Sequence, residues 1–108
     1  MDQGTAGAGG DQSPTSVLRH LMPYTGTLGI VFDRYDAEEV RGRLEWSPDL
    51  CTTGGVLHGG VIMALADSTG AANAFLNLPD GATGTTTVDS STRFLRAVRD
   101  GSIEARSR

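Results

Sequence analysis

An acidic side chain lies in the middle of the most apolar segment of the sequence. Asp67 occurs in the run MALADSTGAA, and no Lys or Arg lies between residues 58 and 76. Burying an ionised carboxylate among apolar groups is unfavourable unless it is paired or hydrogen-bonded. Asp67 could therefore be structural, with hydrogen bonds to backbone or to the hydroxyls of Ser68 or Thr69. Alternatively, its segment lines a cleft, and partial burial tunes the carboxyl group as a base or nucleophile.

The motif His58-Gly59-Gly60 opens the same segment. The first N–H groups of a helix have no partner within the helix and lie at the positive end of its dipole. Two glycines there leave the backbone bare, so that a carbonyl oxygen could approach these N–H groups as in an oxyanion hole. The simpler interpretation is a tight turn into the helix, with His58 as its cap.

The spacing of these two features limits how they can cooperate. Eight residues separate Gly59 from Asp67, which is about 12 Å along a helix. One substrate carbonyl cannot be held at the first residue and attacked from the second within the same helix. If both residues serve one reaction, the site combines the helix N-terminus of one subunit with Asp67 of another. The spacing therefore predicts an isologous dimer with two shared sites.

The first elements of the chain are a tail and a short helix. Residues 1–13 are Gly, Ala and polar residues, which predicts a disordered tail. Ser13 followed by Pro14 is typical of a helix start. We expect Pro23 and the region of Gly26 to end this helix. Its apolar face would be formed by Val17, Leu18, Leu21 and Met22.

Alternating polar and apolar residues then predict a β-hairpin. The alternation begins at Thr27, a turn is expected at Asp36-Ala37, and the alternation resumes over residues 40–46. Residues 47–55 are predicted to form a loop. The side chains expected to face the core are Leu28, Ile30, Phe32, Val40, Gly42, Leu44 and Trp46, and those expected to face solvent are Arg41, Arg43 and Glu45.

The rest of the chain suggests a sheet around one helix. Residues 58–76 have scarcely a polar face, which predicts a helix that is buried on nearly all sides. Residues 85–98 are rich in strand-forming residues, and Asp100-Gly101 is a hairpin signal before a strand that starts at residue 103. An α+β fold, with an antiparallel sheet wrapped around a central helix, satisfies this order. About four strands are too few to cover that helix, so we expect a C-terminally truncated fragment of one domain, residues 14–108.

Composition restricts the function classes. The net charge of -4 argues against a nucleic-acid partner. Arg93, Arg96 and Arg99 cannot coat a duplex but could hold one phosphorylated small molecule. Cys51 is the only cysteine, which excludes an intramolecular disulfide and a cysteine metal cluster. We expect it to be a spectator thiol. No signal peptide and no apolar run of ~20 residues occur, so a cytoplasmic protein without a membrane span is expected.

Two segments together resemble a known family. The stretches GGVLHGGVIMALADSTGAA and TVDSSTRFLRAVRDGSI resemble hotdog-fold thioesterases of the phenylacetic-acid-degradation type, and the resemblance extends from about Pro14 to the C-terminus. It implies a long helix wrapped by an antiparallel sheet and a homodimer or dimer-of-dimers tetramer. It also implies hydrolysis of an acyl-CoA to free acid and CoA, without a metal or redox cofactor. The last two strands of the family's sheet would be absent here.

Matched by position, the resemblance assigns roles to individual residues. The family's catalytic acid falls on Asp67, its backbone donor on Gly59-Gly60, and its His on His58. Many members carry Asn or Gln fifteen residues before the acid, where this chain has Thr52. That departure puts the polar partner of the carbonyl or water in doubt.

Further polar contacts are less closely matched to the family. Members with a hydroxyl one turn after the acid have it where this chain has Ala71, and Thr87 could supply a hydroxyl instead. In the family's FLRP-like segment, Ala97 replaces a common Pro. Arg96 and Arg99 could bind the phosphates of CoA, because Arg suits bidentate phosphate contact. They could equally be solvated surface residues.

Several functions remain open at this point. Asp67 could activate water as a general base or attack the thioester to form a mixed anhydride. The domain could instead bind acyl-CoA as a regulatory module without turnover, or the fragment could be inert. Phenylacetyl, hydroxybenzoyl and medium-chain aliphatic acyl groups all remain possible substrates.

Overall fold

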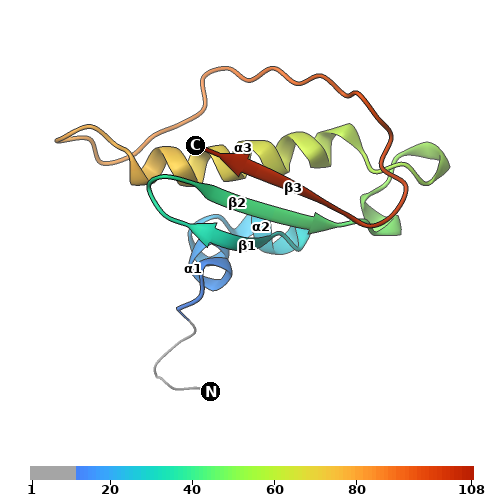
Figure 1. The fold of residues 1–108 in the computed structure, drawn as a ribbon, viewed down its shortest axis with the longest axis horizontal. Helices are drawn as coiled ribbons and strands as arrows, with labels where there is room; N and C mark the ends of the chain where they lie inside the picture. Colours follow the sequence, from blue (N-terminus) through green and yellow to red (C-terminus); the bar gives the residue numbers. More distant parts are fainter. Residues whose placement is uncertain (1–11) are drawn as a thin grey trace.

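The structure is a computed structural model that describes residues 12–108. The tail expected at residues 1–13 lies outside the described residues up to residue 11. The described chain is an α+β unit in which a three-stranded antiparallel sheet packs against one long helix, as Figure 1 shows. The order of elements is α1 (Pro14–Leu21), α2 (Pro23–Leu28), β1 (Val31–Tyr35), β2 (Val40–Glu45), α3 (Gly59–Leu76) and β3 (Ser102–Ser107), with two short 3-10 turns between β2 and α3.

The N-terminal helix begins where the sequence predicts. The hydroxyl of Ser13 accepts a hydrogen bond from the Ser16 N–H at 3.2 Å, and Pro14 occupies the first turn. The expected end is only partly right, because Pro23 opens a second helix, α2. Proline is pre-organised for the first position of a helix. The first strand therefore starts at Val31 rather than at Thr27, after Gly29 has ended α2 in the left-handed conformation.

The predicted hairpin is confirmed. Strands β1 and β2 are antiparallel, and Asp36 Oδ1 accepts hydrogen bonds from the N–H groups of Glu38 and Glu39 in the connecting turn, each at 3.0 Å. Along β2, buried residues alternate with more exposed ones. On the outer face Arg43 Nε donates to Asp33 Oδ2 at 3.0 Å. The outward arginines expected from the sequence thus form ion pairs on the solvent face.

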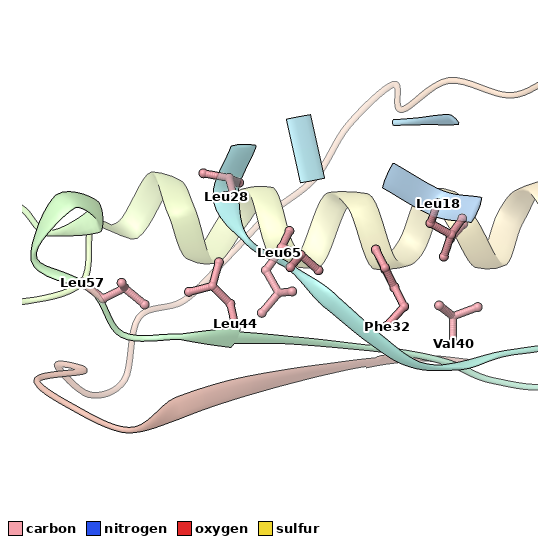
Figure 2. Packing of buried hydrophobic residues seen from close by; sticks show 9 residues of the cluster. Leu18, Leu28, Phe32, Val40, Leu44, Leu57 and Leu65 are labelled. Carbon is pink, nitrogen blue, oxygen red and sulfur yellow. The ribbon is translucent and has the colours of Figure 1, made fainter. Parts of the chain in front are cut away.

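The sheet and α3 approach each other closely at a glycine. A Cβ atom at Gly42 would lie 2.6 Å from Thr69 Oγ1 and 3.2 Å from Leu65 Cδ1. The absence of a side chain at Gly42 therefore lets β2 approach α3. Figure 2 shows the core that results between the sheet, α3 and the two short helices. Its buried residues are Leu18, Leu28, Ile30, Phe32, Val40, Leu44, Leu57, Leu65 and Ala72.

The strand expected over residues 85–98 is not formed. These residues run as exposed extended chain past α3 and then turn at Gly101 into β3, which pairs with β2 (Figure 1). Strand propensity reflects packing on a pleated, half-buried surface rather than a backbone preference. No described strand lies beside residues 85–98 to supply that surface, so their composition alone does not produce a strand.

The burial expected for α3 is also only partly realised. Leu65, Thr69, Ala72 and Asn73 are buried. Met63 and Phe75, by contrast, are 41% and 47% exposed. Three strands cover one side of the helix, and the apolar residues on its other side remain accessible. That accessible side carries Asp67.

Candidate functional site

The N-terminus of α3 presents one free backbone donor. His58 is the N-cap, and its Nδ1 accepts a hydrogen bond from the Gly60 N–H at 3.0 Å. The His58 carbonyl accepts from the Val61 N–H at 3.0 Å. Among the described residues the Gly59 N–H has no hydrogen-bond partner. His58 therefore caps the helix through Gly60, and the N–H of Gly59 remains available.

A hollow of about 440 Å³ lies in front of this donor. Thr52, Gly59 and Arg96 line it together, so three residues predicted from the sequence meet there. The Phe94 ring covers Gly59, since a Cβ at Gly59 would lie 3.1 Å from Phe94 Cζ. The remaining lining residues are Val56, Leu57, Ile62, Leu95, Ala97 and Val98. The hollow is thus mainly apolar, with one cation and one backbone donor.

The other predicted arginine lies close to this hollow. Arg99 Nη1 donates to the Gly54 carbonyl at 3.3 Å, which ties the turn before β3 to the loop before α3. Arg96 is exposed and has no ion-pair partner among the described residues. The structure therefore places both arginines at the end of the molecule where the free N–H lies.

Asp67 lies in a separate groove, between α3 and the extended segment. Its carboxylate is exposed, and its Oδ1 accepts a hydrogen bond from the Thr87 hydroxyl at 2.7 Å. The Thr69 hydroxyl donates instead to the Leu65 carbonyl, at 2.8 Å. The partner of Asp67 is therefore Thr87, which the sequence offers as an alternative hydroxyl donor, and not Thr69. Ala71 lines the same groove and leaves room beside the carboxylate.

The groove contains a second acid that the sequence analysis did not single out. The groove has a volume of about 270 Å³ and is lined by Asp89 and Ser90 as well as by Asp67 and Thr87. Side chains two residues apart point to the same side of an extended chain. Once Thr87 is placed beside Asp67, the same spacing brings Asp89 to the groove. The spacing of Thr87 and Asp89 can be read from the sequence, but it points to the groove only when the contact between Thr87 and Asp67 is known.

The two parts of the candidate site are not joined within one chain. The hollow at Gly59 and the groove at Asp67 share no lining residue. Eight residues of α3 separate them, or about 12 Å at the standard helical rise. The separation inferred from the sequence is thus present in the described chain, and neither part alone has both a carbonyl-binding donor and a carboxylate.

A cluster of ion pairs around one buried carboxylate lies outside both parts. The Glu39 side chain is only 8% exposed and contacts Arg41 and Arg108, with Arg108 Nε at 2.9 Å from Glu39 Oε1. Hydrogen bonds from Arg108 and Arg41 lower the pKa of Glu39 from 4.5 to about 2. This cluster joins the hairpin turn to the end of β3 and has a structural role.

Comparison with known proteins places the chain in a family. The model of the thioesterase superfamily matches residues 54–108, which include the whole of α3, the extended segment and β3. The chain belongs to the thioesterase superfamily. Its antiparallel sheet and long central helix are those of the hotdog fold, with three strands present in the described residues.

Individual relatives agree with this assignment. Rv1847 of Mycobacterium tuberculosis, which is named a candidate esterase, is 31% identical over 88 residues that make up 80% of this chain and 63% of Rv1847. Its structure aligns with a TM-score of 0.73. Thioesterase HI1161 from Haemophilus influenzae is 28% identical with a TM-score of 0.75 over 89% of this chain and 68% of its own.

A third relative carries the name of the family type that the sequence resembles. A mutant of the phenylacetic acid degradation protein PaaI from Thermus thermophilus is 29% identical, with a TM-score of 0.63 over 78% of this chain and 70% of its own. This chain spans 63% of the length of its mycobacterial relative Rv1847. The suspected family and fold are confirmed by these comparisons.

The described residues contain neither a membrane-spanning helix nor a metal-binding cluster. Within residues 12–108, no helix has the length and apolarity needed to cross a bilayer. The same residues contain no cluster of three or more His, Cys, Asp or Glu side chains suited to a metal ion.

Proposed function

We propose that this superfamily member hydrolyses an acyl-CoA thioester to a free acid and CoA, with Asp67 as the catalytic carboxylate. The observation that carries this proposal is the hydrogen bond between Asp67 and Thr87 in an open groove. Asp67 is the only charged residue on α3, and its exposed carboxylate serves no packing role there. Its contact with Thr87 engages Oδ1, and Oδ2 has no hydrogen-bond partner among the described residues.

The proposed reaction needs only a base or nucleophile and an oxyanion stabiliser. Asp67 either removes a proton from water as it attacks the thioester carbonyl, or attacks that carbon itself and forms a mixed anhydride that water then hydrolyses. In both routes the carbonyl oxygen gains negative charge and the thiolate of CoA leaves. No metal or redox cofactor takes part in either route.

The Gly59 N–H of a second copy would stabilise this oxyanion. A single backbone donor of this kind is worth about 3 kcal/mol in other acyl-transfer enzymes. The separation of the hollow from the groove supports a shared site in a homodimer or a dimer of dimers. The segment beside them also exposes large apolar side chains, with Val88 94% and Leu95 90% exposed. Exposed apolar patches of this kind are typical of protein interfaces.

The remaining predicted residues fit around the thioester in this arrangement. Thr52 lines the Gly59 hollow and would contact the carbonyl or the attacking water, and His58 would hold the helix cap. Arg96 and Arg99 lie at the same end and would bind the phosphates of CoA. The Arg96 guanidinium is the better placed of the two, because Arg99 already donates to Gly54.

The first experiment is a thioesterase assay with a thiol-reactive dye that reports released CoA. We expect Asp67→Ala to lower kcat/KM by a factor of about 10² to 10⁴, the range for loss of a general base. Asp80→Ala, at an exposed turn after α3, is the matched control and should keep wild-type turnover. Equal turnover in wild type and Asp67→Ala would show that Asp67 is not the catalytic carboxylate.

A second candidate function is an acyl-CoA-binding module without turnover. Thr52, in place of the amide side chain common in the family, favours this alternative. A folded oligomer that binds acyl-CoA but hydrolyses neither aryl nor aliphatic substrates would support it. Binding would then survive in Asp67→Ala.

Shared sites can be tested by complementation. Gly59 is the first residue of α3, so Gly59→Pro removes the N–H while keeping a residue that helices accept at this position. Gly59→Pro and Asp67→Ala should each be nearly inactive, and Gly59→Ala should retain far more activity because it keeps the donor. When the two inactive variants are unfolded, mixed equally and refolded, half of the dimers are mixed and each has one intact site. About a quarter of wild-type activity should return. If no activity returns, the Gly59 N–H and the Asp67 carboxylate do not act together across two subunits.

A further inference from the structure

An apolar cavity opens beside the Asp67 groove, where α1 faces α3. Its volume is about 380 Å³, at the lower end of the range for small-molecule sites. Leu18, Leu21 and Met22 form the wall on the α1 side, and Phe75 forms part of the wall on α3. None of the proposed catalytic steps uses this cavity.

The cavity adjoins the groove that holds the carboxylate. Ala71 and Thr85 line both spaces. Ala71 lies one helical turn after Asp67, and Thr85 precedes Thr87 by two residues. A molecule whose reacting carbon lies at Asp67 would therefore meet the cavity about one helical turn away, on the far side of Ala71. The side chain at this border is a single methyl group.

The chemistry of the walls excludes a charged occupant. No Asp, Glu, Lys or Arg lines the cavity, and its side-chain polar atoms are the hydroxyls of Tyr35 and Thr85. Burial raises the pKa of Tyr35, so this hydroxyl is neutral at physiological pH. Moving a carboxylate from water into such a space is unfavourable without a partner. Burial of a hydrocarbon group there is favourable, by contrast, because it removes apolar surface from water.

We propose that the cavity between α1 and α3 receives the acyl group of the thioester and selects uncharged hydrocarbon acyl groups of medium length. This inference rests on the proposed function, because Asp67 supplies its reference point. The eight residues from Asp67 to Phe75 correspond to about 12 Å of helix, which limits the length of group that fits. Leu21 and Phe75 are half exposed at the rim, so α1 sets the outer limit.

The test is a chain-length profile of kcat/KM over saturated acyl-CoA substrates. We expect about a fourfold rise for each added CH₂, the equivalent of 0.8 kcal/mol, until the cavity is full, followed by a fall. Succinyl-CoA should be at least about 100-fold poorer than the neutral substrate of equal length. A profile that is flat with chain length would overturn the inference.

Matched variants on α1 locate the effect. Leu21→Trp adds volume at the rim of the cavity and should move the optimum to shorter acyl groups, with about a tenfold or greater change in the ratio of long to short substrates. His20→Trp adds the same side chain at the neighbouring exposed position, which does not line the cavity. Its profile should match that of wild type. Identical profiles for the two variants would refute the role of α1.

Binding separates this inference from the proposed function. The affinities of non-hydrolysable thioether analogues of acyl-CoA, measured by calorimetry, should follow the same length dependence and the same shift in Leu21→Trp. Length-dependent binding without hydrolysis would support the cavity and refute the proposed enzyme. Hydrolysis that depends on Asp67 but not on chain length would keep the enzyme and refute the cavity. The absence of both would refute both.

Discussion

The close approach of β2 and α3 at Gly42 predicts that one methyl group added at this residue substantially lowers the stability of the fold. In Gly42→Ala the new Cβ would lie 2.6 Å from Thr69 Oγ1, far inside normal contact, and 3.2 Å from Leu65 Cδ1, which is a tight contact. The Thr69 hydroxyl cannot easily turn away, because it donates to the Leu65 carbonyl at 2.8 Å and its residue is only 1% exposed. The helix and strand must separate instead.

The magnitude follows from two opposing terms. Overpacking a core typically costs about 1–3 kcal/mol, and two buried contacts place this case in the upper part of that range. Alanine is favoured over glycine in a strand by roughly 0.5–1 kcal/mol, which offsets part of the cost. We expect Gly42→Ala to lower the free energy of unfolding by about 2 kcal/mol. Urea denaturation followed by the fluorescence of Trp46, the single tryptophan, would measure it.

A double-mutant cycle identifies the cause. Thr69→Ala removes the oxygen that Gly42→Ala would strike, so the double variant should be more stable than the sum of the single effects by about 1–2 kcal/mol. Gly70→Ala is the control, since a Cβ at Gly70 has no neighbour within 4 Å and should stabilise the helix by up to about 1 kcal/mol. Additive effects in the cycle would show that the contact with Thr69 is not the reason why Gly42→Ala is destabilising.

Two further predictions concern single polar contacts. Thr87→Val removes the hydroxyl that donates to Asp67 and should lower kcat about tenfold, which corresponds to a hydrogen bond to a charged group of about 1.5 kcal/mol. Thr87→Ser keeps a hydroxyl and should have nearly the kcat of wild type, so equal kcat values in the valine and serine variants would contradict this role. The pKa of Glu39 is lowered from 4.5 to about 2 by Arg108 and Arg41, so its stabilising contribution is complete above pH 4.5 and is lost as the pH falls toward 2. Urea midpoints should show Glu39→Gln to be less stable than wild type at pH 6, and the difference should disappear near pH 2; a constant difference would exclude the ion pairs as its source.

The elements that were predictable from the sequence are those with local determinants. The start of α1 follows from Ser13 and Pro14, whose effects act within one helical turn. The hairpin follows from the alternation along β2, because the same face of a strand meets the core at every second residue. The second helix was missed for a related reason, since Pro23 both disfavours the interior of one helix and favours the start of another.

Features that depend on distant neighbours could not be predicted in this way. Residues 85–98 have the composition of a strand, but a strand needs another one beside it, and composition does not state whether one is present. The bond between Thr87 and Asp67 joins residues twenty positions apart, so the sequence could offer Thr87 only as one possible donor. Asp89 was missed because its relevance depends on that same contact.

The position of the extended segment links assembly to the proposed chemistry. Thr87 reaches Asp67 from this segment, the Val98 carbonyl accepts a hydrogen bond from the Leu57 N–H at 2.8 Å, and Arg99 holds the Gly54 carbonyl. Between these contacts Val88 and Leu95 are almost fully exposed. In the proposed shared site, a second copy would cover these side chains, place its own Gly59 near Asp67 and also stabilise the segment that carries Thr87. Because burial of the apolar side chains and completion of the site then occur in the same event, activity and oligomerisation would respond together to protein concentration.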